Sequence, residues 1–156
     1  MSELMVTFAF KVDAPGFFSW LIRFITKSQD GISHVEVIFP DGRSFSSREP
    51  KGVSWDVVDY NRNKWIFCDV RITEEQHYRM LTLAWQLDRA PYDFLGCARI
   101  YVVKSVENAR QFCSEVGGRM AQVIGLVERM DPNLTSPQRL YDGMASHPMV
   151  SVRRNF

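Results

Sequence analysis

The sequence predicts an α+β fold in which an antiparallel sheet packs against helices, and three observations carry this prediction. Short segments rich in valine, isoleucine and phenylalanine alternate with turn residues in the first half of the chain. Apolar residues recur at helical spacing in other segments. The length of 156 residues and the 46% of hydrophobic side chains are ordinary for one globular domain. We therefore expect a single domain over residues 1–156 with a folded core.

The first half of the chain predicts most of the sheet. Its clearest feature is a hairpin, because the Asp-Gly turn at Pro40–Gly42 joins two segments of strand character. The break at Asp13–Gly16 ends an earlier strand. The predicted strands are Met5–Val12, Ser33–Phe39, Arg43–Ser47, Val53–Val58, Trp65–Ile72 and a last one at Met149–Val152.

Helices are predicted in four places. The best-defined start is Thr73, because Gln76 follows it at the spacing of a capping box. The segment Phe17–Thr26 is interpreted as a core-facing helix, with an amphipathic helix on a membrane surface as the alternative. The predicted helices are Phe17–Thr26, Thr73 to just before Ala90, Cys113 to about Leu126, and Ser136–Pro137 to about Met144.

Charge and hydropathy exclude several partners. The chain has 19 Lys and Arg against 18 Asp and Glu, and no basic run follows a phosphate backbone, so nucleic acid is not expected as a partner. The longest apolar stretch, Phe17–Thr26, falls short of the ~20 residues that span a bilayer. The start of the chain carries Glu3 and no basic region typical of a secretory signal. We expect a cytoplasmic protein without integral membrane association, and the sequence leaves its oligomeric state open.

One strand carries a possible acid–base pair. Alternation places a histidine and a carboxylate about 7 Å apart on one face, within reach of each other. The apolar face carries Val35, Val37 and Phe39, and the other carries His34, Glu36 and Ile38. A base and the group that orients it can sit side by side there. The alternative is an ordinary polar face of an antiparallel sheet.

Cys113 is the candidate nucleophile among three cysteines. It falls at the predicted start of a helix, where the helix dipole favours the thiolate. The alternative is a buried, inert thiol. Cys68 and Cys97 lie in apolar segments and are expected to be inert, while His77 and His147 are expected at the surface. The odd number of cysteines argues against a disulfide framework and fits a reducing compartment.

Motifs for metals and nucleotides are missing from the sequence. It has no HxH, HExxH or CxxC spacing, and neither GxGxxG nor a P-loop. We therefore expect no metal site and no cofactor.

Five segments together, in order and spacing, are similar to one known family. They are residues 33–39 with the histidine, Gly52-Val53, Pro91-Tyr92-Asp93-Phe94, Phe112-Cys113-Ser114-Glu115 and residues 136–141. The chain resembles the circularly permuted NlpC-type papain-fold cysteine hydrolases, relatives of the lecithin:retinol acyltransferase group. In that permuted group the histidine strand precedes the nucleophilic cysteine, as it does here. The resemblance covers about Phe17 to Tyr141 and implies a permuted papain-like fold.

The resemblance also implies roles for individual residues. Cys113 matches the nucleophile and His34 the general base. Family members tend to place a polar orienting residue on the returning hairpin strand, and Ser46 occupies that position here. A serine orients an imidazole more weakly than a carboxylate, so either Glu36 is the orienting group or the enzyme is weakened. Tyr92 matches an aromatic residue that lines the cleft or donates to the oxyanion, or else packs in the core.

These assignments predict a thiol hydrolase of the peptidase or amidase kind. Attack by Cys113 on an amide or ester carbonyl would give a thioester that water then hydrolyses. Peptides, peptidoglycan and lipid acyl groups are the substrate classes that the relatives imply, and the last keeps a lipid acyltransferase-like enzyme open. The rival interpretation is a non-catalytic binding or virion-associated structural module that retains the fold.

Overall fold

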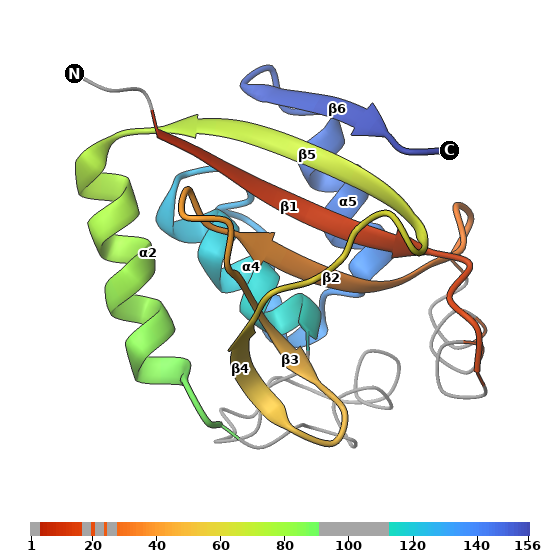
Figure 1. Cartoon of the computed structure of the whole chain (residues 1–156). Coiled ribbons are helices and arrows are strands. Elements are labelled where there is room, and N and C mark those ends of the chain that lie inside the picture. Colours follow the sequence, from red (N-terminus) through yellow and green to blue (C-terminus); the bar gives the residue numbers. More distant parts are fainter. Residues whose placement is uncertain (1–3, 17–19, 21–23, 25–27, 91–112) are drawn as a thin grey trace.

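The computed structural model describes residues 4–16, 20, 24, 28–90 and 113–156. Within this part of the chain, six strands form one antiparallel sheet in the order β4-β3-β2-β1-β5-β6 (Figure 1). The strands are β1 Leu4–Val12, β2 Ile32–Ile38, β3 Ser44–Arg48, β4 Gly52–Asp56, β5 Lys64–Ile72 and β6 Val150–Arg154. The helices are α2 Glu74–Leu87, α4 Cys113–Val123 and α5 Pro137–Ala145, with a 3-10 turn, η1, at Pro132–Leu134. The predicted α+β class with an antiparallel sheet is confirmed.

The main core lies between one face of the sheet and the three helices. Phe8 and Phe10 of the central strand β1 are fully buried there. Val35 and Val37 of β2 join the same cluster, as the predicted apolar face required. The helices contribute Met80 and Ala84 from α2, Val116 and Met120 from α4, and Leu140 and Met144 from α5. Burial of these side chains is the main driving force that fixes α4 against β2.

The opposite face of the sheet carries a second, smaller cluster. Ala9, Trp65 and Phe67 are buried there, next to the partly buried Tyr60. The Tyr60 ring meets Trp65 and Phe67 edge-on, with centroids 4.9 and 5.7 Å apart. Asn155 donates from Nδ2 to the carbonyl of Tyr60 at 2.8 Å, so the end of the chain ties down the segment between β4 and β5. This segment brings Tyr60 over the face that carries His34.

Most predicted elements are confirmed, with shifted ends. The hairpin β2–β3 turns at Gly42, whose φ of +84° favours glycine. The capping box of Thr73 and Gln76 is present at the start of α2. Helix α4 ends at Val123 rather than near the predicted Leu126, because the chain turns at Gly125 with a φ of +82°.

The predicted helix at Phe17–Thr26 lies outside the described residues except for two aromatic side chains. Trp20 and Phe24 are exposed and stack on each other with ring centroids 5.4 Å apart, so the interpretation as core-facing is wrong for these two side chains. Within the described residues, no helix combines the length and the apolar character needed to cross a membrane.

Candidate active site

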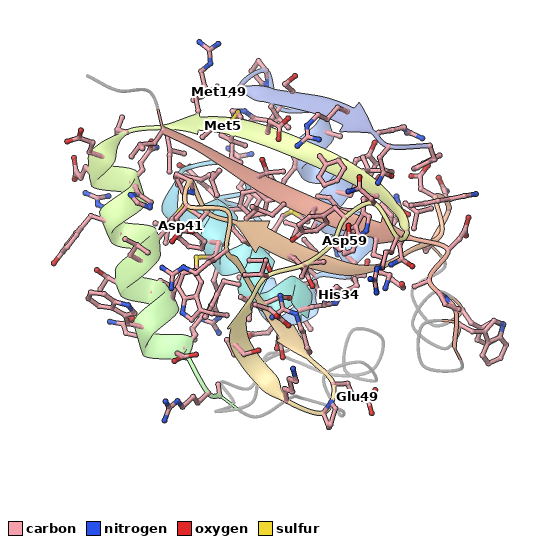
Figure 2. The ribbon with its side chains drawn as sticks, in the orientation of Figure 1. Met5, His34, Asp41, Glu49, Asp59 and Met149 are labelled. Atoms are coloured by element: carbon pink, nitrogen blue, oxygen red, sulfur yellow. The ribbon has the colours of Figure 1, made fainter. Side chains whose placement is uncertain are left out.

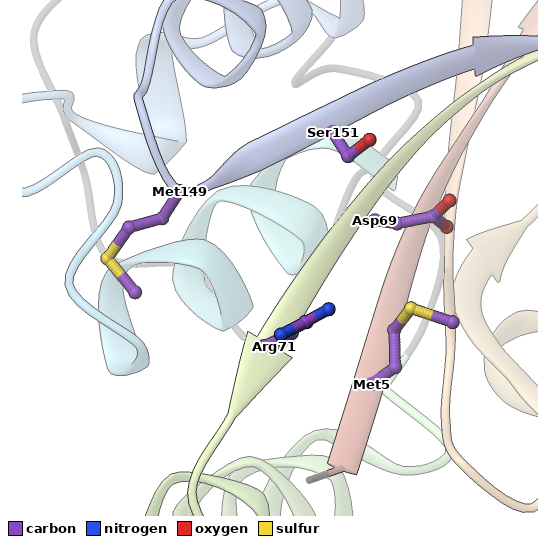
Figure 3. Close-up of a pocket in the computed structure, with 5 residues that line it drawn as sticks. All are labelled: Met5, Asp69, Arg71, Met149 and Ser151. Carbon is purple, nitrogen blue, oxygen red and sulfur yellow. The ribbon is translucent and has the colours of Figure 1, made fainter.

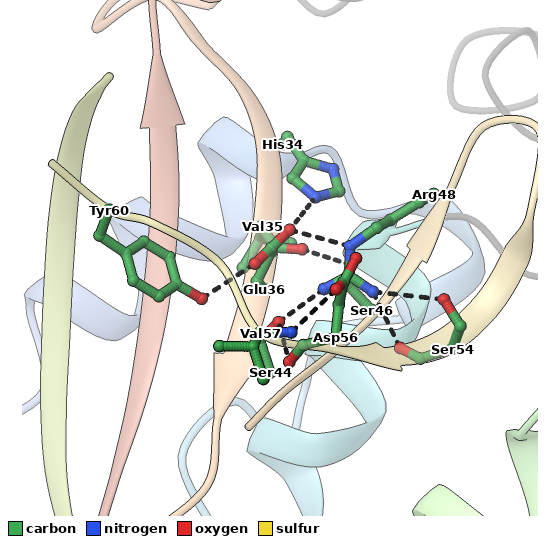
Figure 4. A network of polar contacts seen from close by, with 10 residues as sticks. All are labelled: His34, Val35, Glu36, Ser44, Ser46, Arg48, Ser54, Asp56, Val57 and Tyr60. Carbon is green, nitrogen blue, oxygen red and sulfur yellow. Dashed lines mark hydrogen bonds and ion pairs between the residues drawn. The ribbon is translucent and has the colours of Figure 1, made fainter. Parts of the chain in front are cut away.

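His34 and Glu36 meet on the face of β2 that turns away from the three helices (Figure 4). Nε2 of His34 and Oε1 of Glu36 are 3.1 Å apart, and the side chains are 23% and 5% exposed. An ionised carboxylate only accepts hydrogen bonds, so Nε2 carries the proton of this bond. The second ring nitrogen, Nδ1, is then the atom of a neutral ring that accepts a proton.

Glu36 is held by two further side chains. Arg48 of β3 donates from Nε to Oε1 at 3.1 Å, and the hydroxyl of Tyr60 donates to Oε2 at 2.9 Å. Burial raises the pKa of Glu36, but the hydrogen bond and charge of His34, followed by those of Arg48, outweigh burial and lower the pKa to about 2. Burial and the negative charge of Glu36 raise the pKa of Tyr60, so its hydroxyl stays a donor. Glu36 is therefore a buried carboxylate with a partner on each oxygen.

The guanidinium of Arg48 is itself fixed by neighbours on β3 and β4. It donates from Nη1 to the carbonyl of Ser54 at 2.9 Å and from Nη2 to the hydroxyl of Ser44 at 2.6 Å. Figure 4 shows this network joining strands β2, β3 and β4 around the carboxylate. These hydrogen bonds fix the Arg48 side chain next to Glu36, on the strand face that carries His34.

Ser46 lies on β3 beside this network, but its hydroxyl serves the backbone. It donates to the carbonyl of Val35 at 2.6 Å, and its side chain is buried. Of the two candidates for orienting His34, it is Glu36 whose side chain contacts the imidazole.

Cys113 lies in helix α4, where the described part of that helix begins, and it is 1% exposed. The next residue, Ser114, donates its hydroxyl to the carbonyl of Thr135, which ties the first turn to the segment before α5. The thiol belongs to the core cluster of Val35, whereas His34 alternates to the other side of β2. The pairing of Cys113 with His34 stays a prediction.

The other predicted residues fall in different places. Tyr92 and Cys97 lie outside the described residues. Cys68 is fully buried in β5, and burial raises the pKa of its thiol to about 12. His77 and His147 are partly exposed, and Nδ1 of His147 accepts a hydrogen bond from the backbone of Met149. Within the described residues, no three His, Cys, Asp or Glu side chains are grouped to hold a metal ion.

Sequence reasoning missed Arg48 and Tyr60. Arg48 follows Ser46 at the spacing of one strand face, so the alternation that placed Glu36 also predicts it on the same side of the sheet. Tyr60 lies in an irregular polar segment, where no periodic pattern assigns a direction to the side chain.

A cavity lies on the same sheet away from this network, at strands β1, β5 and β6 (Figure 3). Its volume is about 370 Å³, and Met5, Asp69, Arg71, Met149 and Ser151 line it. Figure 2 shows Met5 and Met149 near each other in the upper part of the view, apart from His34. Arg153 donates to Asp69 at 2.6 Å at this face. None of the predicted site residues lines this cavity.

No protein-family model matches this chain, and no curated protein matches it. The likeness to the permuted papain-fold hydrolases therefore rests on the sequence motifs.

Proposed function

We propose that the protein is a cysteine hydrolase of permuted papain-like fold, with Cys113 as nucleophile, His34 as general base and Glu36 as the residue that orients the ring. The observation that carries this proposal is the contact of Glu36 with Nε2 of His34. It holds the imidazole in one orientation and leaves Nδ1 as the ring nitrogen that can exchange a proton. The predicted position of Cys113 at the start of a helix supports the same assignment, because the helix dipole favours a thiolate there.

The reaction follows from these roles. The Cys113 thiolate attacks the carbonyl carbon of an amide or ester, and the negative charge that develops on oxygen is stabilised by backbone N–H groups at the helix start. The His34 imidazolium gives its proton to the leaving amine or alcohol as the thioester forms. Water, deprotonated by the neutral imidazole, then attacks the thioester and releases the acid and the thiolate. Peptides, peptidoglycan and lipid acyl groups are the substrate classes that the resemblance implies, and the reaction uses no cofactor.

Alkylation with iodoacetamide at about pH 6 tests the proposal without knowledge of the substrate. Cys68 is the matched control, because both thiols are buried and that of Cys68 has a pKa of about 12. We expect Cys113 to be labelled first, and His34→Ala to slow its labelling because the partner cation is lost. Mass spectrometry of the labelled peptides gives both rates. Equal, slow labelling of the two thiols, or an unchanged rate in His34→Ala, would refute the hydrolase and leave the binding module.

A further inference from the structure

Both oxygens of the Glu36 carboxylate accept hydrogen bonds, and the donors come from three different parts of the fold. Oε1 accepts from His34 and Arg48, and Oε2 accepts from Tyr60. These partners come from β2, from β3 and from the segment between β4 and β5. A carboxylate held at one oxygen only can rotate about its last side-chain bond, whereas one held at both oxygens has a single orientation.

Arg48 differs from the surface arginines that also pair with carboxylates. Its side chain is 13% exposed, and its guanidinium group donates hydrogen bonds to Glu36, Ser44 and Ser54. Arg62, in contrast, pairs with Asp59 while its side chain is 82% exposed. A screened surface pair contributes little, but a buried carboxylate needs its partner cation to remain ionised.

We propose that Arg48 and Tyr60 are positioning residues of the candidate active site, which hold Glu36 as a carboxylate aimed at Nε2 of His34. Their catalytic meaning rests on the proposed function, since neither residue is assigned a contact with substrate. Arg48 supplies the positive charge next to the shared oxygen, and Tyr60 fixes the second oxygen. Together they keep the imidazole oriented while the ring exchanges protons at Nδ1.

Side-chain NMR of the full chain tests this inference independently of Cys113. The carboxyl carbon of Glu36 is followed from pH 7 downward while the backbone spectrum stays native, and the Nε2 proton of His34 is observed at the same time. The variants are Arg48→Met, Arg48→Lys and Tyr60→Phe, with Arg62→Met as the matched control. Should Arg48→Met fail to fold, the other two variants decide.

In the wild type, Glu36 is expected to stay ionised down to about pH 3, since its pKa is about 2. In Arg48→Met the titration midpoint of Glu36 should rise, because the positive charge of Arg48 is lost while the burial remains, and the Nε2 proton signal should broaden by exchange with water. Arg48→Lys should keep the titration midpoint of Glu36 low, because the positive charge remains, but it should broaden the signal of the Nε2 proton of His34. Tyr60→Phe should broaden the proton signal as well, and Arg62→Met should change neither quantity.

Two outcomes separate this inference from the proposed function. If Arg48→Met and Tyr60→Phe leave the Glu36 midpoint and the Nε2 proton as in the wild type, the two residues only stabilise the fold and the positioning role is refuted. If both quantities change but Cys113 is labelled no faster than Cys68 in the wild type, the positioning role stands and the cysteine hydrolase is refuted.

Discussion

The hydroxyl of Ser46 donates to the carbonyl of Val35 across 2.6 Å, at the point where β2 and β3 stop pairing through their backbones. The two strands share only the register pairs Val37–Phe45 and Ile38–Ser44. Beyond them, the serine side chain satisfies a carbonyl that a regular ladder would have satisfied with a backbone N–H. Ser46 therefore fixes β3, and with it Arg48, beside Glu36.

Ser46→Ala should lower the free energy of unfolding by about 1 to 3 kcal/mol, because the buried carbonyl of Val35 loses its donor. Urea denaturation measures the change. Ser146→Ala is the matched control, since its hydroxyl also donates to a carbonyl, that of Gly143, but at an exposed position. The control should change stability by a few tenths of a kcal/mol at most. Equal effects of the two substitutions would show that the Ser46 bond is not structural.

Glu36→Gln should slow iodoacetamide labelling of Cys113 by about tenfold or more, whereas Ser46→Ala should slow it little in the protein that remains folded. The reason is that a carboxylate stabilises the imidazolium and a hydroxyl bound to the backbone does not. Rates are compared at about pH 6 on the folded fraction of each variant. The reverse ranking would return the orienting role to Ser46.

The individual strands and helices were largely predictable from local patterns, whereas the order of the strands in the sheet was not. Alternation in β2 identified the buried Val35 and Val37, and the capping box located the start of α2 at Thr73. These features depend on neighbours in the sequence, which a single chain displays directly. The end of α4 was placed too late because Gly125 follows residues of good helical character, and only the turn itself shows where they stop being helical.

The network around Glu36 was predictable only in part. The contact with His34 joins residues two positions apart, so strand periodicity predicts it. The contacts with Arg48 and Tyr60 join residues 12 and 24 positions away, and they depend on how β3 and the segment before β5 fold back over β2. Long-range contacts of this kind come from tertiary packing, which no local pattern in one sequence encodes.

The low pKa of Glu36 should make the stability of the protein depend on acid. Its pKa is about 2 in the folded chain against an ordinary 4.5, so the unfolded chain takes up the proton first as the pH falls. The carboxylate therefore contributes stability above about pH 5, on the order of 3 kcal/mol, and this is lost as the pH falls from 4.5 toward 2. Urea denaturation at pH 7, 5 and 3 measures the stability difference between wild type and Glu36→Gln, which should shrink toward pH 3.

Asp59→Asn is the control for this pH series, because Asp59 also pairs with an arginine but is exposed. Its difference from the wild type should be small at every pH. A Glu36→Gln difference that is the same at pH 7 and pH 3 would contradict a carboxylate held ionised by its partners.

Helix α4 lies so close to β2 that Gly117 leaves no room for a methyl group. A Cβ at this position would lie 3.0 Å from Cδ2 of Leu140 and 3.2 Å from Cγ1 of Val35. Val35 is β-branched and buried in a strand, so it cannot turn aside. Gly117→Ala should therefore lower the free energy of unfolding by about 1 kcal/mol, although alanine favours a helix, since overpacking costs about 1 to 3 kcal/mol.

Gly143→Ala in α5 is the matched comparison for Gly117→Ala. Its Cβ would approach Sδ of Met130 at 3.0 Å, but a methionine is flexible and moves at low cost. This variant should gain up to about 1 kcal/mol from helix propensity.

Under the proposed function, Gly117→Ala should also slow labelling of Cys113, because the displaced α4 carries the thiol away from the strand of His34, whereas Gly143→Ala should not. Urea denaturation and the labelling rate measure the two effects. A Gly117→Ala protein as stable as Gly143→Ala, with an unchanged Cys113 rate, would show that the contact between α4 and β2 does not set the position of the thiol.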